Sequence, residues 1–123
     1  MRVFSLLLLF GFLISCSENQ TFSPTEDIEF GAPYRIVTTS DMPTISNRIL
    51  NSRVGYSGCN PGHEFELKSN TDNAVTEIWL FKKNSQLCEA YFEEERKFTL
   101  SERVLRSDKI FLVTPGEERI SLK

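Results

Sequence analysis

The sequence predicts an all-β domain, a small antiparallel β-sandwich or barrel of about six or seven strands with one disulfide. Segments rich in β-branched and aromatic residues recur along the chain, and such residues are typical of strands. Clusters of glycine, proline, asparagine and aspartate separate these segments at regular spacing, as turns do. No segment keeps a 3.6-residue apolar period over three turns, which argues against a helix-rich fold.

The expected strands are short, and two single helical turns are expected between them. The strands are expected at residues 34–39, 53–56, 63–68, 74–82, 88–100, 109–113 and 119–122. One helical turn is expected over residues 44–50, because Ile45 and Ile49 are four residues apart. The second is expected over residues 101–105, where Ser101 can act as the N-cap.

Residues 74–82 form the most apolar stretch after the N-terminal segment. Such a run indicates a strand that is covered on both faces, or a central strand of the sheet. The alternative is that Trp79 and Phe81 form an exposed binding stripe on one face. The polar residues 69–73 before this strand are expected to form a turn.

Residues 88–100 are long for a single strand and mix polar and apolar residues on one face. Glu94 and Arg96 share the inward parity of Phe92 and Phe98. Because charged side chains are not expected in the core, we expect this strand to bend, to bulge or to leave the core midway.

The first sixteen residues have the pattern of an export signal. Arg2 is followed by a mostly apolar stretch, residues 3–14. This stretch is shorter than the ~20 apolar residues of a transmembrane helix and matches the apolar region of a signal peptide. It ends in Leu13-Ile14-Ser15-Cys16, a tetrad that resembles the lipobox of bacterial lipoproteins. Plain secretion and an uncleaved N-terminal anchor are the alternatives.

This resemblance implies that residues 1–15 are removed and that Cys16 becomes the lipidated first residue of the mature chain. The lipid would be a diacylglyceryl group, usually with a further acyl chain such as palmitate. Two or more chains anchor a protein stably to a membrane. The expected location is therefore the bacterial cell envelope. Ser17, in place of an aspartate after the cysteine, resembles outer-membrane sorting in Gram-negative bacteria.

Residues 16–33 are polar and acidic with few apolar side chains. They predict a flexible tether that joins Cys16 to a single β domain at residues 34–123. The alternative is that Ile28 and Phe30 form a first short strand. The 108 residues that follow the signal suffice for one small domain. They hold 13 basic and 17 acidic residues, a formal charge of −4, which argues against binding to nucleic acid.

Cys59 and Cys88 remain once Cys16 is assigned to lipid. In an exported chain, an even number of cysteines predicts a disulfide. The bridge would close a loop of about 30 residues and stabilise the fold by about 3–4 kcal/mol in the chain-entropy model. The alternative is a metal site with Cys59, His63 and Cys88 as ligands, although zinc requires four ligands or three and a water. We expect no metal and no cofactor.

His63 is the only histidine of the chain and shares the parity of Phe65 and Leu67. We therefore expect a packed imidazole; a pH-sensitive contact or a general base is the alternative. A Ser-His-Asp triad would need this histidine. No Gly-x-Ser-x-Gly motif, phosphate-binding loop or dinucleotide motif occurs. These observations favour a protein that is not an enzyme.

Four short motifs together resemble a group of small bacterial envelope lipoproteins. They are Gly58-Cys59-Asn60, His63-x-Phe65-x-Leu67, Cys88-Glu89-Ala90 and Phe98-x-Leu100. They span roughly residues 54–100. The resemblance implies an exported, disulfide-linked β domain, and it supplies no activity.

The sequence therefore favours a lipid-anchored, non-enzymatic module that binds an envelope protein or saccharide. Its candidate binding surface is a sheet face or the loop that contains Asn60 and His63. The alternative is an inhibitor of an envelope hydrolase that inserts the rigid loop 59–63 into a cleft.

Overall fold

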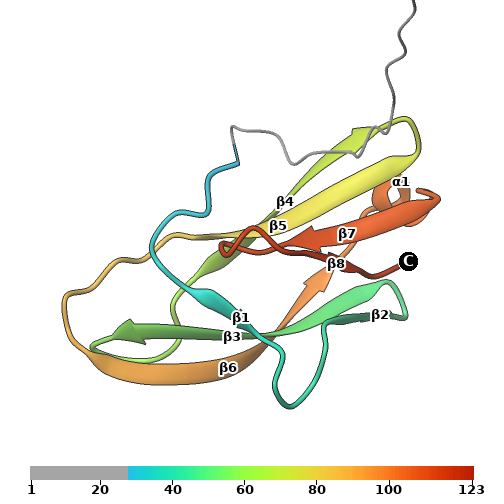
Figure 1. The fold of residues 1–123 in the computed structure, drawn as a ribbon. Helices are drawn as coiled ribbons and strands as arrows, with labels where there is room; N and C mark the ends of the chain where they lie inside the picture. Colours follow the sequence, from blue (N-terminus) through green and yellow to red (C-terminus); the bar gives the residue numbers. More distant parts are fainter. Residues whose placement is uncertain (1–27) are drawn as a thin grey trace, which may run out of the picture.

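Two β-sheets pack face to face and form a sandwich (Figure 1). The structure, a computed structural model, describes residues 28–123. One sheet contains β1 (Arg35–Val37), β2 (Thr44–Ser46), β3 (Ile49–Gly58) and β6 (Ala90–Thr99). The other contains β4 (Phe65–Asp72), β5 (Val75–Lys82), β7 (Lys109–Val113) and β8 (Arg119–Ser121). The all-β class is confirmed, with eight strands in the part of the chain that the structure describes.

Strand β3 is the centre of the first sheet. It pairs with β6 along all ten residues, from Ile49 opposite Thr99 to Gly58 opposite Ala90. Strands β1 and β2 pair with the other edge of β3, and β1 reaches only as far as Gly55. The last three residues of β3, 56–58, therefore have a strand partner on the β6 side only.

The second sheet, in the order β4-β5-β7-β8, is mixed. Strands β5 and β7 are parallel, from Val75 opposite Lys109 to Ile78 opposite Leu112. The expectation of a purely antiparallel sandwich is wrong at this pair. Parallel neighbours need a long crossover. Here the chain leaves β5, passes through β6 in the other sheet and returns through helix α1 (Glu102–Leu105).

The helical turn expected over residues 44–50 is wrong, and a tight hairpin is found in its place. Asn47 and Arg48 have φ angles of 51° and 69°, as the two-residue turns of β-hairpins require. The four-residue spacing of two isoleucines matched a helix, but Ile45 pairs with Leu50 across the hairpin.

The turn expected over residues 69–73 is shorter than predicted. Strand β4 continues to Asp72, and the turn is formed by Asn73 and Ala74, with φ angles of 50° and 68°. The residues at 69–72 are polar because β4 is an edge strand, paired only with β5 among the described strands and largely exposed there.

The expected turn of helix at residues 101–105 is confirmed as α1. The Ser101 hydroxyl accepts a hydrogen bond from the Val104 backbone at 3.3 Å and caps the helix. The hairpin expected at the C-terminus is confirmed as β7 and β8.

The core lies between the two sheets. Strand β5 supplies Ile78 and Leu80 to it, β3 supplies Leu50, and all three are fully buried. Burial of each such side chain stabilises the fold by about 1.5–3 kcal/mol. Since β5 lies between β4 and β7, the expected central strand is confirmed. Trp79 and Phe81 lie on its outer face and are half-buried, so they do not form a fully exposed stripe.

The bulge expected in β6 is wrong, because the register with β3 is continuous, whereas the strand does bend along its length (Figure 1). Glu94 and Arg96 do share a face with the aromatic residues of β6, and their side chains are 22% and 25% exposed. They are accommodated by hydrogen bonds. The Tyr56 hydroxyl donates to Glu94 Oε1 at 2.7 Å, and Arg96 Nη2 donates to the same oxygen at 2.8 Å.

These two side chains also join the sheets. The backbone N–H of Gly62 donates to Glu94 Oε2 at 2.9 Å, and Arg96 donates to the carbonyl of His63. Burial alone would raise the pKa of Glu94. The hydrogen bonds from Tyr56, Arg96 and Gly62, together with the charge of Arg96, outweigh burial and hold the pKa below its ordinary value.

The domain begins earlier than expected. The Ala32 N–H donates to the Lys82 carbonyl at 3.0 Å, and the Lys82 N–H donates to the Phe30 carbonyl at 2.9 Å. Gly31 thus forms a parallel bridge with Lys82. Residues 30–32, which were expected to belong to the tether, therefore pair with the end of β5, close to the alternative of a short N-terminal strand at Ile28 and Phe30. The expected signal peptide, Cys16 and the tether up to residue 27 lie outside the described residues.

We expect Glu94→Gln to lower the free energy of unfolding by about 1–3 kcal/mol at pH 7, because the hydrogen bonds lose a charged acceptor. The folded-state pKa is depressed, so the stabilisation is present above pH 4.5, the ordinary value. It is lost as the pH falls through the folded-state pKa. Urea unfolding at pH 7 and below pH 4 measures this difference.

Glu95→Gln is the matched control, since Glu95 is the next residue of β6 and is exposed on the opposite face. We expect its unfolding midpoint to stay close to that of the unaltered protein at both pH values. Equal pH dependence of the two variants would contradict the role assigned to Glu94.

Candidate binding site at the disulfide end

One end of the sandwich carries a disulfide, and we call it the disulfide end: residues 59–62 together with segment 84–89. Cys59 directly follows β3, and Cys88 lies two residues before β6. Because Gly58 and Ala90 are paired, the two cysteines lie next to each other, with Cα atoms 4.7 Å apart. The predicted disulfide between Cys59 and Cys88 is confirmed.

The disulfide argues against the alternative interpretation, a metal site formed by Cys59, His63 and Cys88. That alternative requires thiolates at Cys59 and Cys88, and in the oxidised structure each sulfur is bonded to the other. The proposed ligand set is therefore not available in this form. Within residues 28–123, no cluster of three or more histidine, cysteine, aspartate or glutamate side chains is arranged to hold a metal ion.

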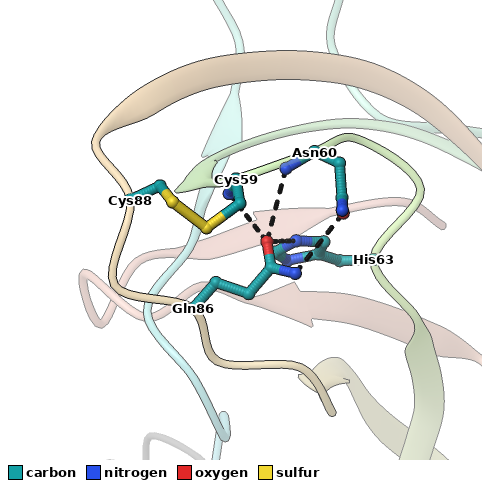
Figure 2. The surroundings of a disulfide bond; sticks show 5 residues. All are labelled: Cys59, Asn60, His63, Gln86 and Cys88. Carbon is teal, nitrogen blue, oxygen red and sulfur yellow. Dashed lines mark hydrogen bonds between the residues drawn. A yellow bond between two sulfur atoms is a disulfide. The ribbon is translucent and has the colours of Figure 1, made fainter.

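Gln86 organises the disulfide end (Figure 2). Its Oε1 accepts hydrogen bonds from the backbone N–H groups of Cys59 at 2.7 Å and Asn60 at 3.4 Å. The same oxygen lies 2.7 Å from His63 Nε2, and Gln86 Nε2 donates to Asn60 Oδ1 at 3.4 Å. Since backbone donors fix this atom as the oxygen, His63 Nε2 must carry its proton. No sequence motif indicates this role for Gln86.

His63 is packed inside the domain, as the sequence favoured. It is 2% exposed and stacks on the Tyr56 ring, with centroids 4.5 Å apart. Its backbone N–H donates to the Tyr56 hydroxyl at 3.2 Å. His63 therefore positions the loop from beneath, where its ring contacts Tyr56 and Gln86.

The accessible part of the predicted loop is residues 59–62, all of which are exposed, including Asn60. Three contacts hold this loop in place: the disulfide, the Gln86 side chain and the bond from Gly62 N–H to Glu94. Because Gly58 has no side chain, His63 and Gln86 can pack closely beneath the loop. A Cβ at Gly58 would lie 2.6 Å from His63 Cε1 and 2.8 Å from Gln86 Oε1.

A cavity of about 320 Å³ lies beside this loop. It occurs where β1 begins, at Arg35 opposite Gly55, beyond which residues 56–58 of β3 have no strand partner on that side. Gln86 belongs to its wall and thus links the cavity to the loop. The lining residues are Ala32, Pro33, Tyr34, Arg35, Gly55, Tyr56, Ser57, Lys82, Ser85, Gln86 and Tyr91.

The cavity is lined by two basic residues and by no acidic residue. Lys82 is 2% exposed, and burial lowers the pKa of its amine. Arg35 is at the rim, with its side chain 67% exposed. Arg35 Nε donates to the Tyr91 hydroxyl at 2.8 Å. Lys82 was not among the residues predicted for the site, although its inward parity with Ile78 and Leu80 could have identified it.

A scan against protein-family models and searches of curated proteins and of solved structures found no match. Over residues 28–123, no helix has the length and apolar character required to cross a membrane.

We expect Gly58→Ala to break the contact between His63 and Gln86, because the added methyl group would overlap both side chains. The free energy of unfolding should fall by about 1–3 kcal/mol. The His63 Nε2–H signal in ¹⁵N NMR should lose its protection from solvent exchange. Urea unfolding and this signal measure the two effects.

Gly116→Ala is the matched control. A Cβ at Gly116 would meet only Thr114 Oγ1, at 3.8 Å, so this variant should unfold at nearly the same urea concentration as the unaltered protein. An unchanged His63 signal in Gly58→Ala would show that the packing does not depend on this glycine.

Proposed function

We propose that the protein is a lipid-anchored module of the bacterial cell envelope that binds a ligand at the disulfide end without catalysing a reaction. The anchor is proposed at Cys16 and the binding site at the cavity and loop 59–62. The ligand class is an envelope protein or saccharide.

The anchor proposal is supported by the N-terminal sequence. A basic residue, a short apolar stretch and the tetrad Leu13-Ile14-Ser15-Cys16 occur in the order of a lipoprotein signal. The disulfide supports export, because disulfides persist in oxidising compartments.

The observation that carries the binding proposal is the junction of a rigid exposed loop with a cavity through one residue, Gln86. Ligand sites are concave and mostly pre-formed, with a few polar groups that orient the ligand. A loop that is already held by a disulfide and hydrogen bonds loses little conformational entropy when it binds. This end of the domain meets both conditions.

A second candidate function is inhibition of an envelope hydrolase by loop 59–62. The observation that favours it is that this exposed loop is fixed at both ends, by the disulfide and by the Gly62–Glu94 hydrogen bond. Loss of inhibition in an Asn60→Ala variant, measured on a hydrolase captured through this loop, would support this candidate over a saccharide ligand.

The anchor is tested with Cys16→Ser in the full-length chain. We expect the unaltered protein to incorporate an alkyne-labelled palmitate and to partition with membranes. The variant should incorporate none and should leave the membrane fraction, because the thioether cannot form. Membrane association that survives in Cys16→Ser would contradict lipid anchoring at this residue.

The binding site is tested by in-cell photo-crosslinking. A photoreactive amino acid at Ser85, which is exposed and lines the cavity, should capture a specific partner. The same group at Asp72, exposed in β4 at the far end of the β4–β5 pairing, should not. Equal capture at both positions, or none at Ser85 above the background of an unrelated lipoprotein, would count against a ligand site at the disulfide end.

A further inference from the structure

We propose that the cavity at the disulfide end binds a ligand through a free carboxylate, which Lys82 holds from the cavity wall. This inference rests on the proposed binding function and specifies the chemistry of its ligand. It is carried by the burial of Lys82, by the neutral character of its partners and by the composition of the cavity.

Lys82 enters the gap between the sheets because of its place in β5. It is the last residue of the strand and has the parity of Ile78 and Leu80, which face the core. Its backbone is fixed by hydrogen bonds with Phe30 and Ala32. The lysine side chain is therefore held inside the domain, where lysine is rarely found unless it is paired.

The partners of the Lys82 amine carry no net charge. Nζ donates a hydrogen bond to the backbone carbonyl of Asn84 and lies 4.9 Å from the centre of the Tyr56 ring. None of the ion pairs among residues 28–123 includes Lys82. Glu94, which accepts from the Tyr56 hydroxyl, is already paired with Arg96.

A buried cation without an anion is costly, and a bound carboxylate would supply the missing partner. Hydrogen bonds between an ammonium and a carboxylate are about twice as strong as neutral ones. The same desolvation lowers the pKa of Lys82. Ligand binding would therefore offset the free-energy cost of burying the Lys82 charge, which the domain without ligand does not offset.

The rest of the cavity agrees with an anionic ligand of small size. Arg35 adds a guanidinium at the rim, which lies 3.9 Å from the Glu93 carboxylate, and Ser57 and Ser85 add hydroxyl groups. A volume of about 320 Å³ is near the lower limit of small-molecule sites. The ligand is therefore a small carboxylate or the carboxyl terminus of a peptide. The open edge of β3 at residues 56–58 favours the peptide, because free strand edges pair with extended chains.

The test uses titration calorimetry on the full-length lipidated protein in detergent micelles. The probes are N-acetyl-Ala-Ala with a free carboxylate, the same peptide as its C-terminal amide, succinate, and inorganic phosphate. We expect saturable binding of the free peptide acid and at least about tenfold weaker binding of the amide, since a charge-assisted hydrogen bond is lost. Tighter binding of succinate than of the peptide acid would assign the carboxylate to a small molecule.

The matched variants are Lys82→Met and Lys83→Met. Methionine keeps the length and apolar stem of lysine, and Lys83 is the exposed neighbour. Lys82→Met should weaken binding of the peptide acid at least about tenfold. Lys83→Met should leave the affinity for the peptide acid unchanged. The urea midpoint of Lys82→Met should stay the same or rise, because an apolar side chain replaces a buried charge that lacks an anion. If Lys82 had only a structural role, Lys82→Met would lower the urea midpoint and leave the affinity for the peptide acid unchanged.

Several outcomes would overturn the inference: no binding of either carboxylate probe, equal binding of the acid and the amide, or phosphate binding as tight as any carboxylate. Unchanged affinity in Lys82→Met would also overturn it. The comparison of acid with amide is made on the unaltered protein, so it stands even if the variant fails to fold. A partner captured at Ser85 despite these failures would retain the proposed binding function and reject only its carboxylate chemistry.

Discussion

The unbroken pairing of β3 with β6 is the constraint on which the other features depend. Ten consecutive residue pairs join the two strands, and β1 and β2 both attach to the opposite edge of β3. The disulfide closes one end of this two-stranded ribbon. Because the ribbon has no bulge, every second side chain of β6 faces the other sheet. Glu94 and Arg96 are thereby brought into the interface, where they meet the backbone of the loop that begins β4.

The features that the sequence predicted correctly are those set by local chemistry. Alternation of apolar and polar residues located most of the strands, and the hydroxyl of Ser101 located the single helical turn. The disulfide was predicted from the number of cysteines and from the expected export. The inward position of His63 followed from its parity with Phe65. None of these predictions required knowledge of which strands are neighbours in the sheets.

The features that the sequence did not reveal depend on contacts between distant segments. The parallel pairing of β5 with β7 requires a crossover through the other sheet. Gln86 has no motif of its own, and its role arises because the disulfide brings it beneath the loop of Cys59. The contacts of the inward charges of β6 could not be predicted from the strand itself, because they include Tyr56 on β3 and the backbone of Gly62 and His63. Lys82 likewise owes its burial to residues 30–32 and to Tyr56.

The parallel bridge of Gly31 with Lys82 has a mechanical consequence. The segment N-terminal to the sheet joins the domain through two backbone hydrogen bonds, both made by the final residue of β5. Tension applied to the N-terminal chain would be transmitted first to those two bonds and from there to the central strand of the sheet. The same residue lines the cavity. Stretching the chain would thus act on a residue that also forms part of the cavity wall.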